Sequence, residues 1–162
     1  MKLKHLFIAM LVFSLLWVSG CSNEIVNEVK GKENEFPPSM TGFIHTNGTK
    51  YEIVSGGYKW EREKGLNTQI VQTDAASPNQ IAEKIKPIAL EPNQKINIEI
   101  EENPQLSVYL WNQNGIEKEM NLHANQITVP SSKGKYIYEV LAKWSNQEVN
   151  GEVSYTFVVE IQ

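Results

Sequence analysis

The sequence predicts an all-β sandwich, and three observations support this prediction. Apolar residues recur at every second position in several segments, Gly- and Asn-rich pairs separate these segments, and only one segment carries helical signals. A period of two is typical of half-buried strands, because successive side chains of a strand point to opposite faces. About eight short strands with frequent turns indicate two packed antiparallel sheets.

The alternation is clearest in the second half of the chain. Four stripes stand out: Ile96, Ile98 and Ile100; Leu106, Val108 and Leu110; Tyr136, Tyr138, Val140, Ala142 and Trp144; and Val153, Tyr155, Phe157, Val159 and Ile161. Weaker strand candidates are residues 42–46, 51–54, 58–62, 68–72 and 127–129. These β-branched and aromatic residues fit a pleated surface that is buried on one face.

Turn residues punctuate the stripes. Asn47-Gly48 and Asn114-Gly115 predict type I′ hairpin turns, which need positive φ at both central residues. Gly56-Gly57, residues 131–134 and Asn150-Gly151 predict further breaks between strands.

One short helix is expected after residue 76. Ser77 is a suitable N-cap, Pro78 fits the first helical position, and Gln80 completes a capping box. Ile81 and Ile85 share one helical face, and Pro87 ends the segment.

The N-terminus has the composition of an export signal. Lys2 and Lys4 precede an apolar run over residues 6–18, which is shorter than the roughly 20 residues of a membrane span. The following Val18-Ser19-Gly20-Cys21 resembles the bacterial lipobox, although that pattern prefers Leu where Val18 stands. The resemblance implies cleavage before Cys21 and a diacylglyceryl group on its thiol, which anchors the chain stably to a membrane. A plain secretory signal or an uncleaved anchor are the alternatives.

Three parts of the chain follow from this interpretation. Residues 1–20 are expected to be the lipoprotein signal peptide, residues 21–40 a polar linker on the lipid anchor, and residues 41–162 the β-sandwich domain. The expected location is the extracytoplasmic face of the cell membrane.

A second resemblance refines the sandwich. Gly134-Lys135-Tyr136-Ile137-Tyr138 resembles the tyrosine corner of immunoglobulin-like domains, with Tyr136 as the corner residue. Trp111 is then a candidate for the core tryptophan, although the alternation places its side chain on the other face of the strand from Leu106, Val108 and Leu110. The segment from residue 136 to the C-terminus also resembles small uncharacterised lipoproteins of Bacillus-type bacteria, which implies a fold and a location without an activity.

Composition limits the chemistry. The chain has 19 Asp+Glu against 15 Lys+Arg and a single cysteine, so nothing indicates nucleic-acid binding or a disulfide framework. His45 and His123 follow the signal segment without a partner at metal-ligand spacing, and no phosphate-binding glycine loop is present. We therefore expect no metal, no cofactor and no catalysis.

The aromatic residues are the remaining binding candidates. Tyr58 and Trp60 share one face of their segment, and Tyr109 and Trp111 share a face of another. Exposed aromatic rings on a rigid sheet suit glycan stacking or a protein contact, whereas buried rings form core. Residues 55–64, Gly-rich and then aromatic and charged, are expected to form a contact loop.

Three functions remain open. The first is a lipid-anchored binding module, acting as adaptor, sensor or assembly factor for an unknown extracellular protein or envelope ligand such as wall glycan. The second is a protease-inhibitor-like sandwich, which needs a protruding loop at residues 130–135 or 113–116. The third is an enzyme, which needs a deep polar cleft that gathers Glu61, Glu63 or His123.

Overall fold

The computed structural model describes residues 35–145 and 149–162, and Ser39–Gln162 form one compact unit. The expected signal peptide, Cys21 and most of the expected linker lie outside the described residues. Within these residues no helix is long and apolar enough to cross a membrane.

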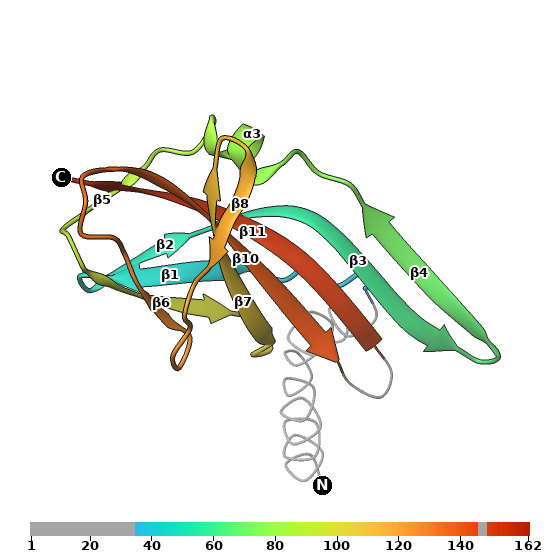
Figure 1. Ribbon diagram of the computed structural model, residues 1–162. Coiled ribbons are helices and arrows are strands. Elements are labelled where there is room, and N and C mark those ends of the chain that lie inside the picture. The colour runs from blue at the N-terminus through green and yellow to red at the C-terminus, as the bar shows by residue number, and fades with distance from the viewer. Residues whose placement is uncertain (1–34, 146–148) are drawn as a thin grey trace, which may run out of the picture. The chain divides into compact units, whose positions relative to one another are not determined.

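The antiparallel β-sandwich is confirmed, with eleven strands and one helix in the described part of the chain (Figure 1). The elements are β1 Gly42–Thr46, β2 Thr49–Glu52, β3 Val54–Lys64, β4 Asn67–Thr73, α3 Pro78–Ala82, β5 Ile88–Leu90, β6 Lys95–Ile100, β7 Gln105–Asn112, β8 Gly115–Glu119, β9 Gln126–Thr128, β10 Gly134–Ser145 and β11 Val149–Ile161.

Two sheets share these strands. The smaller sheet has the order β2-β1-β6-β9, and the larger one has the order β4-β3-β11-β10-β7-β8. β5 pairs in parallel with the end of β11, beyond the part of β11 that pairs with β3. The chain passes repeatedly from one sheet to the other. Most of the core therefore consists of contacts between residues that are distant in the sequence.

The core lies between the sheets and consists of the residues that the alternation predicts. Ile96, Ile98 and Ile100 are at most 4% exposed, and Tyr138, Val140 and Ala142 are fully buried. The predicted stripe of β11 is buried along its whole length. Burial of such side chains contributes roughly 1.5–3 kcal/mol each, which is the main stabilising term of the sandwich.

Helix α3 covers part of the outer face of the larger sheet. Ser77 caps it, and both hydrogen bonds of the predicted capping box with Gln80 are present. The helix contacts β11, β10, β3 and β7. Thr156 and Val158, which point away from the sandwich core, are fully buried on this face.

The tyrosine corner is present, but the tryptophan prediction is wrong. Tyr136 Oη donates a hydrogen bond of 2.9 Å to the Ser132 carbonyl, four residues upstream. Trp111 is only half-buried and lies on the outer face of the larger sheet, as its place in the alternation required. The buried tryptophans are Trp60 and Trp144, whose ring centroids lie 5.1 Å apart.

Two of the predicted breaks are also wrong. Gly56-Gly57 lies inside β3 and Asn150-Gly151 inside β11. Gly151 is there because the Trp60 ring occupies the space next to it: a Cβ at Gly151 would overlap Trp60 Cε3. A glycine in a strand therefore marks a close approach here and not a turn.

Both predicted hairpins form. Asn47 and Gly48 have φ values of 49° and 73°, as a type I′ turn requires. At the second hairpin Gly115 has a positive φ of 126° and Asn114 does not, so that turn is not type I′.

Candidate functional site

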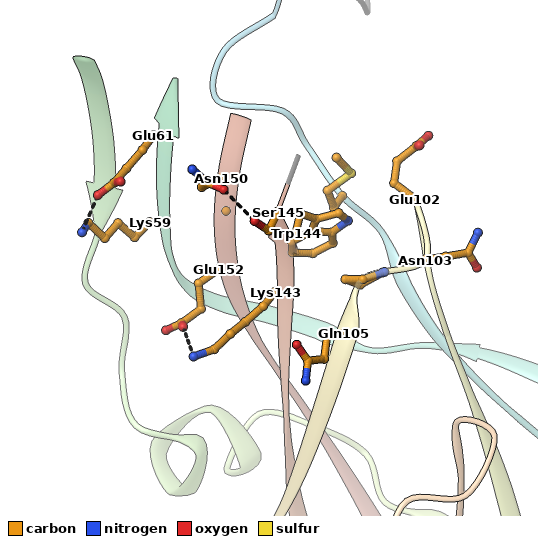
Figure 2. A pocket seen from close by; sticks show the side chains of 13 residues that line it. Lys59, Glu61, Glu102, Asn103, Gln105, Lys143, Trp144, Ser145, Asn150 and Glu152 are labelled. Atoms are coloured by element: carbon orange, nitrogen blue, oxygen red, sulfur yellow. Dashed lines mark hydrogen bonds and ion pairs between the residues drawn. The ribbon is translucent and has the colours of Figure 1, made fainter. Parts of the chain in front are cut away.

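An open groove of about 700 Å³ lies at the end of the larger sheet where β10 ends and β11 begins. We call it the end groove. It is lined by Met40, Lys59, Glu61, Glu102, Asn103, Pro104, Gln105, Lys143, Trp144, Ser145, Asn150, Gly151 and Glu152. Figure 2 shows these side chains, which come from β3, β10, β11, the start of β7, the connection between β6 and β7, and the segment before β1.

Strand register places four polar side chains in one row across the groove. Lys59 on β3 pairs with Glu152 on β11, Glu152 pairs with Lys143 on β10, and Lys143 pairs with Gln105 on β7. We call these four residues the charged row. Neighbouring strands lie about 4.8 Å apart, so the row presents positive, negative and positive groups at regular spacing.

Ion pairs hold the charges in place. Lys143 Nζ lies 2.8 Å from Glu152 Oε2, and Lys59 Nζ lies 2.6 Å from Glu61 Oε1 (Figure 2). The hydrogen bond to Glu61 raises the pKa of Lys59, and the hydrogen bond to Glu152 raises that of Lys143. Both lysines are therefore charged throughout the physiological pH range. These pairs are exposed, so they orient the side chains more than they stabilise the fold.

The wall of the groove is rigid. Trp144 is 8% exposed, and its Nε1 donates a hydrogen bond of 3.1 Å to the Glu101 carbonyl. Met40 is tied down next to it, because Tyr155 Oη donates to the Met40 carbonyl at 2.9 Å. Ser145 Oγ donates to Asn150 Oδ1 at the far end of the groove.

Backbone strain accompanies the groove. Glu102 and Asn103 have φ values of 61° and 45°, in the left-handed region. For a residue such as Glu102 this conformation costs about 1 kcal/mol. Asn93, Ala124 and Asn125, which lie outside the groove, also have a positive φ, so this conformation by itself does not mark the site. The strained turn holds Glu102 and Asn103 at the edge of the groove.

The predicted aromatic residues do not form one surface. Trp60 is 2% exposed and packs against Trp144, so its ring cannot meet a ligand. Tyr58 is half-buried on the same inner face as Trp60. Tyr109 and Trp111 are half-buried on the opposite, outer face, where Trp111 Nε1 donates a hydrogen bond of 2.9 Å to Glu139 Oε2. Only this second pair remains a candidate.

The expected loops differ from the structure. Residues 55–64 are the greater part of strand β3 and not a contact loop, because residues 58–62 pair on both sides, with β4 and with β11. Gln113-Asn114 is a tight two-residue turn, and residues 131–133 form a bend before β10. The exposed tip in this region is instead that of the β3–β4 hairpin, where Leu66 is fully exposed.

The residues of the enzyme interpretation are not gathered in one place. Glu61 lines the end groove, Glu63 lies further along β3 outside it, and His123 forms an isolated bridge with Gln126. In the described part of the chain no three His, Cys, Asp or Glu side chains are close enough together to hold a metal ion.

Sequence reasoning missed the charged row, because single lysines and glutamates on a strand resemble any solvent-exposed face. A correctly placed β10–β11 hairpin would have paired Lys143 with Glu152. The predicted break at Asn150-Gly151 placed the turn several residues after its position in the structure, where β10 ends at Ser145 and β11 begins at Val149. Comparison with protein-family models, with curated proteins and with solved structures returned no match for this chain.

Proposed function

We propose that this chain is a non-catalytic interaction module that is anchored through lipid on Cys21 at the extracytoplasmic face of the membrane and binds a protein partner in the end groove. The observation that carries the proposal is the charged row within an open groove. The lipobox resemblance at Cys21 supports the anchor and the location.

The chemistry of the groove favours a protein surface as the ligand. Its lining combines both signs of charge with the amides of Asn103, Gln105 and Asn150, which is the mixture found at the polar parts of protein interfaces. Glycan sites rely on an open aromatic ring, and the ring of Trp144 is almost fully buried.

Site-specific cross-linking in cells tests the groove. A photoreactive amino acid replaces Gln105, which is exposed in the groove, in the full chain expressed in bacteria. The matched control carries it at Lys133, which is exposed at the bend before β10. We expect one reproducible protein adduct from position 105 and none from position 133, identified by mass spectrometry. No adduct at position 105, or the same adducts from both positions, contradicts the proposal.

The anchor is tested separately. Cells fed a palmitate analogue should label the full chain, and Cys21→Ser should abolish the label and leave the signal segment uncleaved. Equal labelling of both chains would show that Cys21 is not the lipidated residue.

One observation favours the inhibitor as a second candidate. The β3–β4 hairpin presents a fully exposed Leu66 next to Gly65, in a turn that reaches beyond the part of β3 paired with β11. An exposed apolar side chain on a two-stranded support is what insertion into a protease pocket requires. A protease adduct from a photoreactive group at Leu66, with none at Gln105, would decide for this candidate.

A further inference from the structure

Strand β4 is an open edge of the larger sheet. Among the described residues it pairs with β3 alone, and its other side has no partner strand. Its sequence, Asn-Thr-Gln-Ile-Val-Gln-Thr, contains no charged residue and no proline, and Ile70 is 54% exposed. Natural proteins usually protect such edges with charge, proline or short length, because an unprotected edge pairs with another strand.

The other edge strands of the described fold are protected in this way. β8 carries Glu117, Lys118 and Glu119, and β2 carries Lys50 and Glu52. β9 and β5 have only three residues each. The seven uncharged residues of β4 are therefore the exception.

The hairpin geometry shows which backbone groups are free to pair. Lys64 and Asn67 close the two-residue β3–β4 turn and form a hydrogen-bonded pair. Bonded and non-bonded pairs alternate along an antiparallel ladder. Thr68, Ile70 and Gln72 are thus the β4 residues whose N–H and C=O groups point away from β3.

The three outward-pointing residues, Thr68, Ile70 and Gln72, are evenly spaced about Ile70. If β4 of a second copy pairs antiparallel with this strand and the pairing is centred on Ile70, the two Ile70 residues lie opposite each other. Thr68 of each copy then lies opposite Gln72 of the other. All three outward-pointing residues then fall in hydrogen-bonded pairs. We infer that β4 pairs with β4 of a second copy of this chain around a twofold axis at Ile70.

Charges on β3 complement this arrangement. Lys59 neighbours Gln72, and Glu63 neighbours Thr68. Pairing Gln72 with Thr68 of the other copy brings Lys59 of one copy and Glu63 of the other into the same row. The twofold axis produces this arrangement twice in the dimer. Glu61 neighbours Ile70, so the Glu61 side chains of the two copies share the central row, about 14 Å apart. Two rows of opposite charge therefore flank one row of like charge, and β4 itself carries no charge next to the axis.

The dimer joins the two larger sheets into one continuous sheet. The axis is perpendicular to the sheet, so both end grooves open on the same face. The inference rests on the edge of β4 and does not depend on what the groove binds.

Disulfide cross-linking in the membrane tests the contact. In a hydrogen-bonded antiparallel pair the Cα atoms lie about 5.5 Å apart, which a disulfide spans. The full chain with Ile70→Cys, oxidised mildly in intact cells, should give a covalent dimer as its main product. Ile116→Cys is the matched control, because Ile116 is 55% exposed on the opposite edge strand. The unmodified chain is the blank.

The register is tested by mixed pairs. Differently tagged Thr68→Cys and Gln72→Cys chains should cross-link to each other, whereas Thr68→Cys should not cross-link to itself, since two Thr68 positions lie roughly 14 Å apart at 3.4 Å per residue. Adding Ile70→Lys to both chains should lower the mixed yield several-fold. Equal dimer yields at positions 70 and 116, no dimer at position 70, or efficient Thr68→Cys self-linking would each overturn the inference. Occupation of the edge by residues 22–34 or by a foreign strand would give no dimer at position 70.

Discussion

Gly151 determines the tryptophan pair at the base of the sandwich. It lies between Trp60 on β3 and Trp144 on β10 in one row of the larger sheet. Because it has no side chain, the Trp60 ring lies over its Cα and meets Trp144 at 5.1 Å between centroids. The row of Trp60, Gly151 and Trp144 is one residue along each strand from the charged row. A single glycine therefore connects the packing of the core with the candidate site.

Gly151→Ala is expected to lower the free energy of unfolding by about 1–3 kcal/mol, because the new Cβ would overlap the Trp60 ring. The measurement is urea unfolding followed by tryptophan fluorescence. Gly56→Ala is the matched control in a strand, since its Cβ would lie 3.4 Å from Ile81 Cδ1, and it should change stability by less than about 1 kcal/mol. Equal effects of the two substitutions would contradict this packing.

Two tyrosines two residues apart should respond differently to the loss of a hydroxyl. Tyr136→Phe removes the hydrogen bond to the Ser132 carbonyl and should cost about 1 kcal/mol. Tyr138 is fully buried, burial raises its pKa, and its hydroxyl has no hydrogen-bond partner in the described structure. Tyr138→Phe should therefore leave the urea midpoint unchanged or raise it, and a clear decrease would reveal a partner for that hydroxyl.

At the scale of elements, three strands of the smaller sheet are linked on their outer face by one carboxylate. Glu99 on β6 contacts Lys50 Nζ on β2 at 3.0 Å and His45 Nε2 on β1 at 2.6 Å. Lys50 in turn lies 3.8 Å from the centre of the Phe43 ring. Hydrogen bonds from Lys50 and then His45 lower the pKa of Glu99.

This lowered pKa has a defined sign in the pH dependence of stability. The contribution of Glu99 is fully present above its unfolded pKa, near 4.5, and is lost as the pH falls through its lower folded value. The urea midpoints of the native chain and of Glu99→Gln should therefore differ at pH 7 and converge in acid below pH 4.5. A difference between the two urea midpoints that stays constant down to the lowest pH would contradict this role of Glu99. Titration of the Glu99 carboxyl by NMR measures its pKa directly.

At the scale of the whole molecule, the periodic part of the fold could be predicted from the sequence and the contacts between distant strands could not. The stripes of β6, β10 and β11 gave the core, and Ser77, Pro78 and Gln80 gave the helix, because each signal is local. The charged row arises only after β3, β11, β10 and β7 are aligned in register. The choice between an exposed and a buried Trp60 stayed open for the same reason, since its burial depends on Gly151, about ninety residues away in the sequence.

A swap of one ion pair tests the proposed role of the charged row most directly. In the double variant Lys143→Glu and Glu152→Lys the two side chains still pair across β10 and β11, so stability should change by less than about 1 kcal/mol. The order of charges along the row is nevertheless altered. We expect the adduct from a photoreactive group at Gln105 to be lost in this variant while the urea midpoint stays within that range. An adduct that persists undiminished in the folded double variant would contradict the claim that the row recognises the partner.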